Sequence, residues 1–487
     1  MDHRGLRATR KPVQLVADPK RVIIRLFVPG GESRVSAILD RVMALSEAEV
    51  SSILGRVLER YSFRHKDISG VFERHYEAVA SQLNGQVPTS KQRRQLIGTY
   101  FTSEYSLESV ALFNPSVVLH PDQQGMSDGK VRFIISLRAC GEGHISSIEF
   151  RSGVINSSNG ITFDPISPFV ATEGPHDHHL HDKNRFFLKL NEMGAYKPLA
   201  DRILRDLSDK FTLAELQDAI ERVRQRHGGT DSFRELAESM LWLARSSYRL
   251  EYPADSAISE RVIFPVTENE SRGVEDARFV RFTHDDGRVV YYATYTAYNG
   301  FRILPQFIET TDFVHFKVNT QNGRCAQNKG MALFPRKIQD RFVMISRLDG
   351  ENIYLLRSDD IHFWNEAEKM HGPIHPWEFI QIGNCGSPFE TDVGWLLLTH
   401  GVGPMREYWM GALLLDLEDP LRVIGHLKEP ILMPAKNERD GYVPNVVYSC
   451  GGMIHNDDLI IPFGISDTST GIATISVSKL LSCLVRS

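Results

Sequence analysis

The sequence has few of the features that mark several large protein classes. Its five cysteines are scattered over 487 residues and form no Cys-x-x-Cys pair, so we expect neither a zinc ribbon nor a redox motif. No run of about 20 apolar residues occurs, and we expect no membrane-spanning helix. No apolar core follows the basic N-terminal segment. We therefore expect no signal peptide and a cytoplasmic, reducing location.

Neither positive nor negative charge is in large excess. The formal net charge is -5, and no basic stripe with interleaved aromatic residues is present, so a nucleic-acid partner is not expected. Apolar residues make up 42% and charged residues 24%, as in ordinary globular proteins. The length fits one large domain with additions, or two to three domains.

Three regions with different residue patterns can be distinguished along the chain. Residues 1–107 are mainly helical in pattern, with Ser46 and Glu49 spaced as a capping box. Residues 108–487 show short β-branched and aromatic runs broken by Gly, Asp and Asn, which is typical of strands and turns. Residues from about 175 to 250 return to helical spacing, and we interpret them as an insertion within the β region.

An internal repeat runs through the β region. In each copy a polar residue opens an apolar strand, a turn follows, and a second apolar strand ends abruptly in a polar residue. The five copies cover residues 114–138, 275–298, 329–347, 384–400 and 444–467. The pattern predicts an all-β catalytic unit, a five-bladed β-propeller with an N-terminal helical region and a helical insertion. A β-sandwich with irregular turns is the alternative.

The repeat places polar side chains at equivalent strand ends, which meet at one mouth of a propeller. The strand openings carry Asn114, Asp276, Lys329, Asn384 and Asn445, and the strand ends carry Arg138, Tyr298, Arg347, His400 and Asp467. A charged residue next to a buried strand is costly unless it is paired or used. One such residue is more often structural, but ten of them favour a ligand site. Carboxylates suit proton transfer, and the cations suit an anionic ligand.

Several motifs resemble one known family. They lie at residues 273–278 (GVEDAR), 292–298 (YATYTAY), 329–335 (KGMALFP), 399–403 (THGVG), 411–420 (GALLLDLEDP) and 443–451 (VPNVVYSCG). Together they are similar to glycoside hydrolase family 130, over about 108–165 and 255–487. The resemblance implies a five-bladed propeller and, for most members, inverting phosphorolysis of β-mannosides, with some hydrolases. The helical additions resemble those of longer members, some of which act on β-1,2-linked oligomannosides.

The resemblance also implies roles for individual residues. Asp276 matches the general acid, which protonates the glycosidic oxygen through a hydroxyl of the bound mannose, and Glu275 stands beside it. Asn114, Arg138 and Asp467 match positions that hold the non-reducing mannose. Lys329, Arg347, His400 and Tyr408 match phosphate-binding positions, and Tyr298, Asn384 and Asn445 complete the expected substrate-binding set. Phosphate is the expected co-substrate, and neither a metal nor an organic cofactor is expected.

Structural interpretations of these residues stay open. Arg138 and Asp467 also suit a salt bridge between blades, and His400 and Tyr408 suit a satisfied strand end and a core aromatic. Asp276 with its neighbours also suits an ion-paired turn.

Two departures keep other functions open. Ala277 stands where the family usually has proline, and Glu390 stands where some relatives have a basic residue. Glu390 would weaken anion binding or act as the base of an inverting β-mannosidase. A non-catalytic glycan-binding propeller is the third hypothesis.

The insertion opens with a dense histidine cluster at His176, His178, His179 and His181. Its spacing matches no zinc motif, so a solvated loop, or a loop reaching over a neighbouring subunit's active site, is favoured over a metal site. The helical regions are candidates for self-association into a homo-oligomer.

Overall fold

The computed structural model describes residues 6–83, 88, 90–172, 179–195, 198–299 and 303–486. Most of residues 108–476 form antiparallel β sheets, which we divide into five consecutive β units; the first two units are joined into one ten-stranded sheet where β12 pairs with β6. The first unit contains β4 (Ala111–Leu119), β5 (Val131–Cys140), β6 (Ser146–Ile155) and β7 (Ile161–Phe163). The second contains β12 (Gly273–Thr283), β13 (Val289–Tyr298), β14 (Ile303–Thr310), β15 (His315–Thr320) and, at its edge, β10 (Tyr248–Glu251).

The remaining units repeat this plan. The third contains β16 (Ala332–Leu333), β17 (Phe342–Ser346), β18 (Ile353–Ser358) and β19 (Glu366–His371). The fourth contains β20 (Gln381–Asn384), β21 (Phe389–Thr391), β22 (Gly394–Val402), β23 (Tyr408–Leu415), β24 (Val423–His426) and β29 (Val485–Arg486). The fifth contains β25 (Val447–Tyr448), β26 (Met453–His455), β27 (Asp458–Ile465) and β28 (Ser469–Ser476). Short β11 (Val262–Ile263) pairs with β6.

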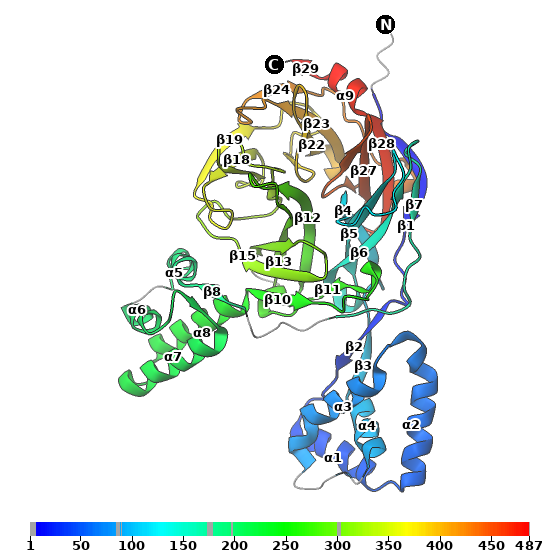
Figure 1. Ribbon diagram of the computed structural model, residues 1–487, viewed down its shortest axis with the longest axis vertical. Helices are drawn as coiled ribbons and strands as arrows, with labels where there is room; N and C mark the ends of the chain where they lie inside the picture. The colour runs from blue at the N-terminus through cyan, green and yellow to red at the C-terminus, as the bar shows by residue number, and fades with distance from the viewer. Residues whose placement is uncertain are drawn as a thin grey trace.

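The five units form a closed circuit of contacts, and Figure 1 shows them arranged around a common centre. Gly273 of the second unit pairs with Ser146 of the first. The Thr294 hydroxyl of the second unit donates to the Met331 carbonyl of the third. The third and fourth units meet where the Ile382 amide donates to the Glu351 carbonyl. Tyr408 of the fourth unit bridges Val446 of the fifth, and Gly451 of the fifth bridges Ser116 of the first. The expected fivefold repeat therefore corresponds to five consecutive units.

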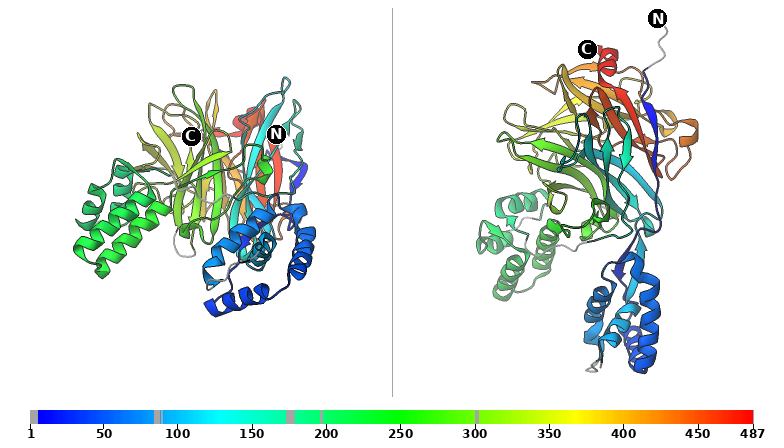
Figure 2. Two further views of the ribbon diagram at one scale, coloured as in Figure 1. Left: turned by 60° about the horizontal axis from the view of Figure 1, so that its bottom comes forward. Right: turned by 45° about the vertical axis from the view of Figure 1, so that its right-hand side comes forward.

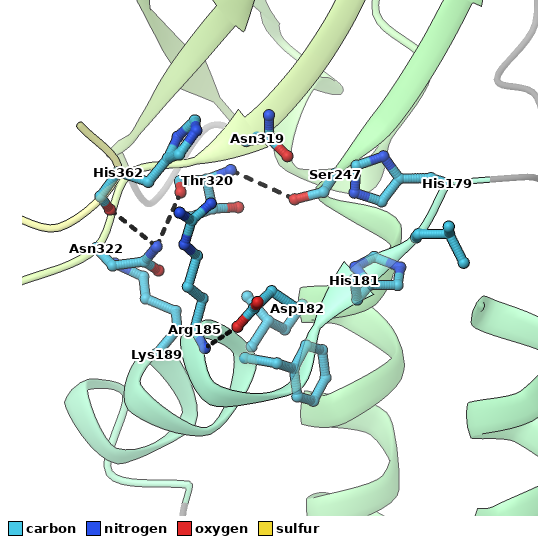
Figure 3. Close-up of a pocket in the computed structure, with 13 residues that line it drawn as sticks. His179, His181, Asp182, Arg185, Lys189, Ser247, Asn319, Thr320, Asn322 and His362 are labelled. Carbon is cyan, nitrogen blue, oxygen red and sulfur yellow. Dashed lines mark hydrogen bonds between the residues drawn. The ribbon is translucent and has the colours of Figure 1, made fainter. Parts of the chain in front are cut away.

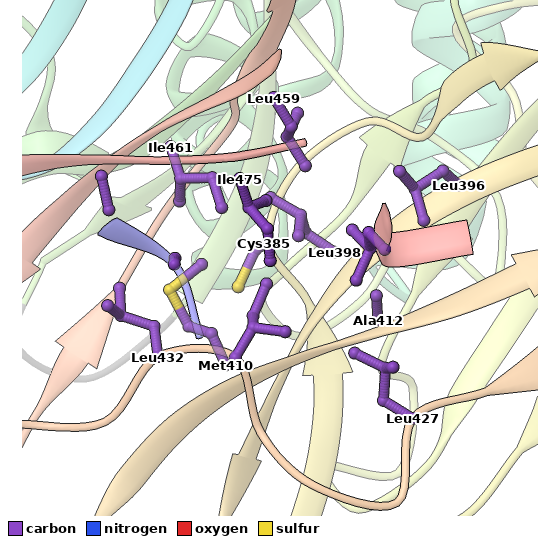
Figure 4. Close-up of a cluster of buried hydrophobic side chains, with 14 of the residues drawn as sticks. Cys385, Leu396, Leu398, Met410, Ala412, Leu427, Leu432, Leu459, Ile461 and Ile475 are labelled. Atoms are coloured by element: carbon purple, nitrogen blue, oxygen red, sulfur yellow. The ribbon is translucent and has the colours of Figure 1, made fainter. Parts of the chain in front are cut away.

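Adjacent units share apolar cores. Figure 4 shows the core between the fourth and fifth units, where Leu398 and Met410 lie close to Ile461 and Ile475. All four side chains are almost completely buried. The inner strands of the β units carry apolar residues on both faces. This pattern explains the packing, because each β unit is covered by a neighbour on both sides.

The N-terminal helices lie apart from the β units, as Figure 2 shows. They are α1 (Glu32–Met43), α2 (Glu47–Tyr61), α3 (Ile68–Val79) and α4 (Lys91–Tyr100), which are linked to the β units through the two-stranded sheet β2 (Val22–Leu26) and β3 (Thr102–Ser106). Ser46 and Glu49 form the expected capping box at the start of α2. Among the described residues, no helix is both long and apolar enough to cross a membrane.

The helical insertion forms a second protrusion beside β10 and β15 (Figure 1). It contains α5 (Lys183–Glu192), α6 (Pro198–Arg205), α7 (Leu213–His227) and α8 (Asp231–Arg245), with the small sheet β8 (His181–Asp182) and β9 (Lys210–Phe211). The insertion has its own apolar core, which includes Leu190, Leu216 and Met240. A short C-terminal helix, α9 (Val477–Cys483), follows β28.

Three strands, β1, β2 and β3, lie within the region expected to be mainly helical, and β1 joins a β unit. Residues 9–15, within the segment expected to be mainly helical, form β1 (Thr9–Leu15), which pairs antiparallel with β28 at the edge of the fifth unit. The side chains of Val13 and Leu15 pack against the core of the first and fifth units. The contact explains the difference, because it joins segments more than 450 residues apart, and local periodicity carries no signal for such a pairing.

Candidate active site

Unusual backbone geometry brings polar side chains together at the centre of the units. Asn114, Asp276 and Asn445 have φ values of 48°, 57° and 63°, and Asp467 has 53°. Asn and Asp tolerate this left-handed region better than most other residues. Asn114 and Asp276 also lie where the strand register shifts, as expected of β-bulges. Each bulge turns a polar side chain out of the ladder and towards the neighbouring units.

An ionic network surrounds the predicted acid. Asp276 accepts a hydrogen bond of 2.8 Å from the Asn114 amide and one of 3.3 Å from Arg138. Arg138 also donates to Glu275 at 2.8 Å, and Lys329 donates to the second oxygen of Glu275 at 2.7 Å. Three β units thus contribute to one contiguous group. The Lys329 ammonium lies 6.0 Å from the ring centre of Tyr298, so this predicted residue borders the same group.

Burial and neighbouring charges set the protonation of the acidic residues in this group. Burial opposes ionisation of Asp276, but the charge of Arg138 and the hydrogen bond from Asn114 outweigh it and hold the pKa of Asp276 below its usual value. Burial and the nearby charge of Asp276 instead raise the pKa of Asp467 to about 7. In the ligand-free site the carboxyl that keeps its proton near neutral pH is therefore Asp467.

Three of the four predicted phosphate-binding residues form a second group beside the first, whereas the fourth, Lys329, belongs to the first group. Arg347 donates to Nε2 of His400 at 3.2 Å, and the rings of His400 and Tyr408 are stacked with centroids 6.0 Å apart. Burial, with the charges of Arg347 and Arg278, lowers the pKa of His400 far below its usual value. His400 is therefore neutral and accepts from Arg347. It orients the guanidinium and contributes no positive charge of its own.

Arg278 and Tyr448 connect the two groups, and neither was among the predicted site residues. Arg278 is buried and donates to the Tyr448 hydroxyl and, at 3.2 Å, to the carbonyl of Asn384. The Tyr448 ring lies 4.9 Å from that of His400. A sequence signal for Arg278 existed, because Arg278 stands in the same GVEDAR motif as Asp276.

Two predicted substrate-binding residues, Asn384 and Asn445, form hydrogen bonds with backbone groups of neighbouring loops or strands. The Asn384 side chain donates to the carbonyl of Gly386 at 3.2 Å. Asn445 is half-buried, and its carbonyl accepts from the Tyr408 amide at 3.0 Å. Both lie beside the second group, and they shape its walls through the backbone.

Glu390 lies away from this site, which contradicts its proposed role as a base. It pairs in register with Trp395 near the start of β22, whereas His400 stands five residues further along that strand. Five strand residues span about 16 Å. Its carboxylate forms two hydrogen bonds with Arg336, of 2.9 and 2.6 Å. Glu390 therefore forms an exposed ion pair between the third and fourth units.

Part of the histidine cluster lies beside the insertion. His176 and His178 are outside the described residues, whereas His179 and His181 border a pocket that also contacts His362 (Figure 3). Burial lowers the pKa of His179 to about 3 and that of His181 to about 4, so both are neutral. No cluster of three or more His, Cys, Asp or Glu side chains in the described part of the chain is arranged to hold a metal ion.

Comparison with known proteins identifies relatives of the β units. A family model described as beta-1,4-mannooligosaccharide phosphorylase matches residues 250–486. A 1,2-beta-oligomannan phosphorylase of Thermoanaerobacter sp. is 36% identical over 222 residues, which are 44% of this chain and 72% of that protein. A beta-1,2-mannobiose phosphorylase of Listeria innocua is 30% identical over 227 residues, 45% of this chain and 62% of that protein.

A solved structure of the Listeria innocua enzyme in complex with beta-1,2-mannobiose is also similar. It has a TM-score of 0.47 and 18% identity, and the match covers 78% of this chain and 93% of that one. The sequence matches show the family without it. The chain belongs to glycoside hydrolase family 130, an enzyme family that includes the phosphorylases named above.

Proposed function

We propose that this protein cleaves β-mannosides by phosphorolysis with inversion of configuration, releasing α-mannose 1-phosphate and a shortened glycan. The observation that carries the proposal is the central group itself. A pair of carboxylates, Glu275 and Asp276, lies against Arg138 and Lys329, with Arg347 held by His400 beside them. An inverting displacement needs a proton donor for the leaving oxygen and cations for an incoming dianion. Both kinds of group are present.

The residue roles in this proposal are those that the resemblance implies, and the contacts described above support them. Asn114, Arg138 and Asp467 form the mannose side, and Asp276 delivers the proton to the glycosidic oxygen. Arg347 and Lys329 hold phosphate for attack on the opposite face of the anomeric carbon. Lys329 is bound to Glu275 and its side chain is 38% exposed, so it is accessible to an anion. No general base is needed, because phosphate itself is the nucleophile.

Two finer assignments belong to the same proposal. We interpret the closed circuit of five units as a five-bladed propeller. We also favour β-1,2-linked manno-oligosaccharides as substrates. The names of the relatives at 36% and 30% identity support this linkage. A relative from Ruminococcus albus, a beta-1,4-mannooligosaccharide phosphorylase, is 32% identical over a shorter stretch, so β-1,4-linked substrates belong in the test.

The proposal is tested by incubating the protein with β-1,2- and β-1,4-mannobiose, each with and without inorganic phosphate. We expect mannose 1-phosphate only when phosphate is present, with β-1,2-mannobiose the better substrate. Free mannose formed equally without phosphate would instead indicate a hydrolase. No product from either sugar would leave a non-catalytic glycan-binding protein as the remaining hypothesis.

A further inference from the structure

A second cavity lies between the helical insertion and the second and third β units. Its volume is about 550 Å³, within the range of small-molecule sites. Glu192 of α5 and Trp242 of α8 form the wall from the insertion. The opposite wall includes Asn269, Arg324, Gln327 and Asn328. The lining thus combines one large aromatic ring and several amide and charged groups with an apolar patch that includes Met193, Ile303 and Leu304.

This cavity is continuous along the chain with the candidate active site. Asn328, in its wall, precedes Lys329, and its side chain donates to the carbonyl of Arg347 at 3.1 Å. Asn299, also in the wall, follows Tyr298. Two residues of the wall are therefore direct chain neighbours of the site residues Tyr298 and Lys329. The cavity lies on the side of the second and third units, whereas Asn114 and Asp467 belong to the first and fifth.

The chemistry of the lining suits a hydroxyl-rich ligand. Asn269 is only 3% exposed; its amide nitrogen donates to the Ser246 hydroxyl, but its carbonyl oxygen has no hydrogen-bond partner among the described side chains. A buried acceptor left unpaired is costly, so a hydrogen-bond donor is expected there. A sugar supplies hydroxyl donors, and its apolar face can pack on an indole ring such as that of Trp242.

The wall that the insertion contributes is held firmly in place. The Lys189 ammonium is buried and donates to the Gln321 carbonyl at 2.9 Å. The Glu192 carboxylate accepts from the Gly323 amide. These contacts join α5 to the loop before the third unit, so Trp242 and the loop that carries Gln327 face a cavity of defined shape. A preformed site loses little conformational freedom when a ligand binds.

We propose that this cavity binds the part of the β-mannoside chain that lies beyond the cleaved bond, so that the helical insertion makes the protein prefer longer oligosaccharides. The proposal rests on the proposed function. A mannose held by the first and fifth units directs the rest of its chain across the centre, towards the second and third units. The insertion stands there with Trp242 and the amide groups.

The experiment compares kcat/KM for β-1,2-mannobiose and β-1,2-mannotetraose in the wild type, Trp242→Ala and Gln327→Ala. We expect each variant to lower the tetraose-to-biose ratio, with Trp242→Ala lowering it about tenfold, the equivalent of one stacking contact. Leu188→Ala is the matched control, because Leu188 lies on α5 of the same insertion, is 37% exposed and does not line the cavity. Gln327 lies outside the insertion, so its variant separates binding from folding of the helices.

An unchanged ratio in both cavity variants would overturn the proposal. If the wild type phosphorolyses none of the mannosides, the proposed function fails separately, and calorimetric titration of mannotetraose then decides. Weaker binding by Trp242→Ala than by Leu188→Ala would still support a glycan site. Equal binding by both, or no binding by the wild type, would reject it.

Discussion

At the scale of single residues, the main question is which carboxyl group supplies the proton to the glycosidic oxygen. Arg138 and Asn114 stabilise the ionised form of Asp276, so near neutral pH this carboxylate carries no proton to donate. Asp467 holds a proton up to about pH 7. A bound mannose that inserts its hydroxyls between Asp276, Arg138 and Asn114 would weaken the contacts that keep Asp276 ionised. Substrate binding and protonation of the acid are therefore coupled.

The Asp276→Asn substitution tests the acid directly. It keeps the size of the side chain but removes the transferable proton, and general acid catalysis contributes about 10²- to 10⁴-fold. We expect kcat for phosphorolysis to fall at least 100-fold while mannobiose still binds. Mannose 1-phosphate release, measured together with calorimetric binding, checks both. A loss smaller than tenfold would place the acid elsewhere.

Asp467→Asn should change how stability depends on pH. The folded-state pKa of Asp467 is raised to about 7, so the native state binds a proton that the unfolded chain has lost above about pH 4. The stability linked to this group is therefore full below about pH 4 and is lost as pH rises through 7. An amide cannot ionise, so we expect the variant to melt a few degrees above the wild type at pH 8.

The melting temperatures at pH 4 and pH 8, from scanning calorimetry, check this prediction. At pH 4 the two proteins should differ little. A variant that melts lower than the wild type at pH 8 would show that the Asp467 carboxylate is stabilised in the folded protein, contrary to its raised pKa.

Glu390→Gln separates the two catalytic hypotheses. Glu390 is bound to exposed Arg336. It lies on β21 opposite Trp395, which is five residues along β22 from His400, so we expect an unchanged kcat/KM for mannobiose. The expected stability loss is below 1 kcal/mol, as for other exposed ion pairs. A 100-fold loss of mannose release without phosphate would restore Glu390 as the base of a hydrolase.

At the scale of elements, a buried ionic cluster fixes β2 to the first unit. Arg21 contacts Glu108 at 2.9 Å and Glu149 at 2.7 Å, and Arg151 contacts both carboxylates from the other side. Arg21→Met would leave two buried carboxylates facing one guanidinium. We expect a loss of about 3 to 5 kcal/mol in the free energy of unfolding, as for other broken buried pairs.

Urea denaturation of Arg21→Met beside Lys20→Met, whose residue is exposed, measures this loss. Burial and the charge of Glu149 raise the pKa of Glu108 to about 8. Glu108 can then take up a proton at low pH, so the deficit should be smaller at pH 6 than at pH 9. Equal stability of the two variants would mean that the cluster adds nothing to this junction.

The elements that sequence analysis located correctly are those governed by local chemistry. Ser46 caps α2 with Glu49 three residues later, and such a box is visible in a short stretch of sequence. The repeat likewise placed Asn114, Asp276 and Lys329 in one contiguous group, because equivalent strand ends meet in a closed array. These parts of the fold and site required no knowledge of distant contacts.

The parts that escaped prediction depend on distant partners. The ionised state of Asp276 depends on Arg138, and the neutral state of His400 depends on burial beside Arg347 and Arg278. Residue spacing reports neither a partner's distance nor its burial. The position of Glu390 was missed for the same reason, since its pairing with Arg336 joins two different units.

At the scale of the whole molecule, β1 links the start of the chain to the last β unit. Val13 packs into the apolar core beneath β28, whereas its neighbour Gln14 is exposed. We expect Val13→Asp to cost about 2 kcal/mol, because it places a charge against that core. Gln14→Asp is the matched control. Melting temperatures of both variants check this, and equal values would mean that β1 docks only loosely.

The pairing of β1 with β28 also has a consequence for synthesis in the cell. At about 5 to 20 residues per second, β28 leaves the ribosome on the order of half a minute or more after β1. During that delay β1 is a nascent strand without its partner, open to pairing with other chains. Its sequence begins Thr9, Arg10, Lys11 and Pro12, and the two positive charges and the proline are features that discourage such pairing. These residues therefore protect β1 from mispairing until β28 has been synthesised.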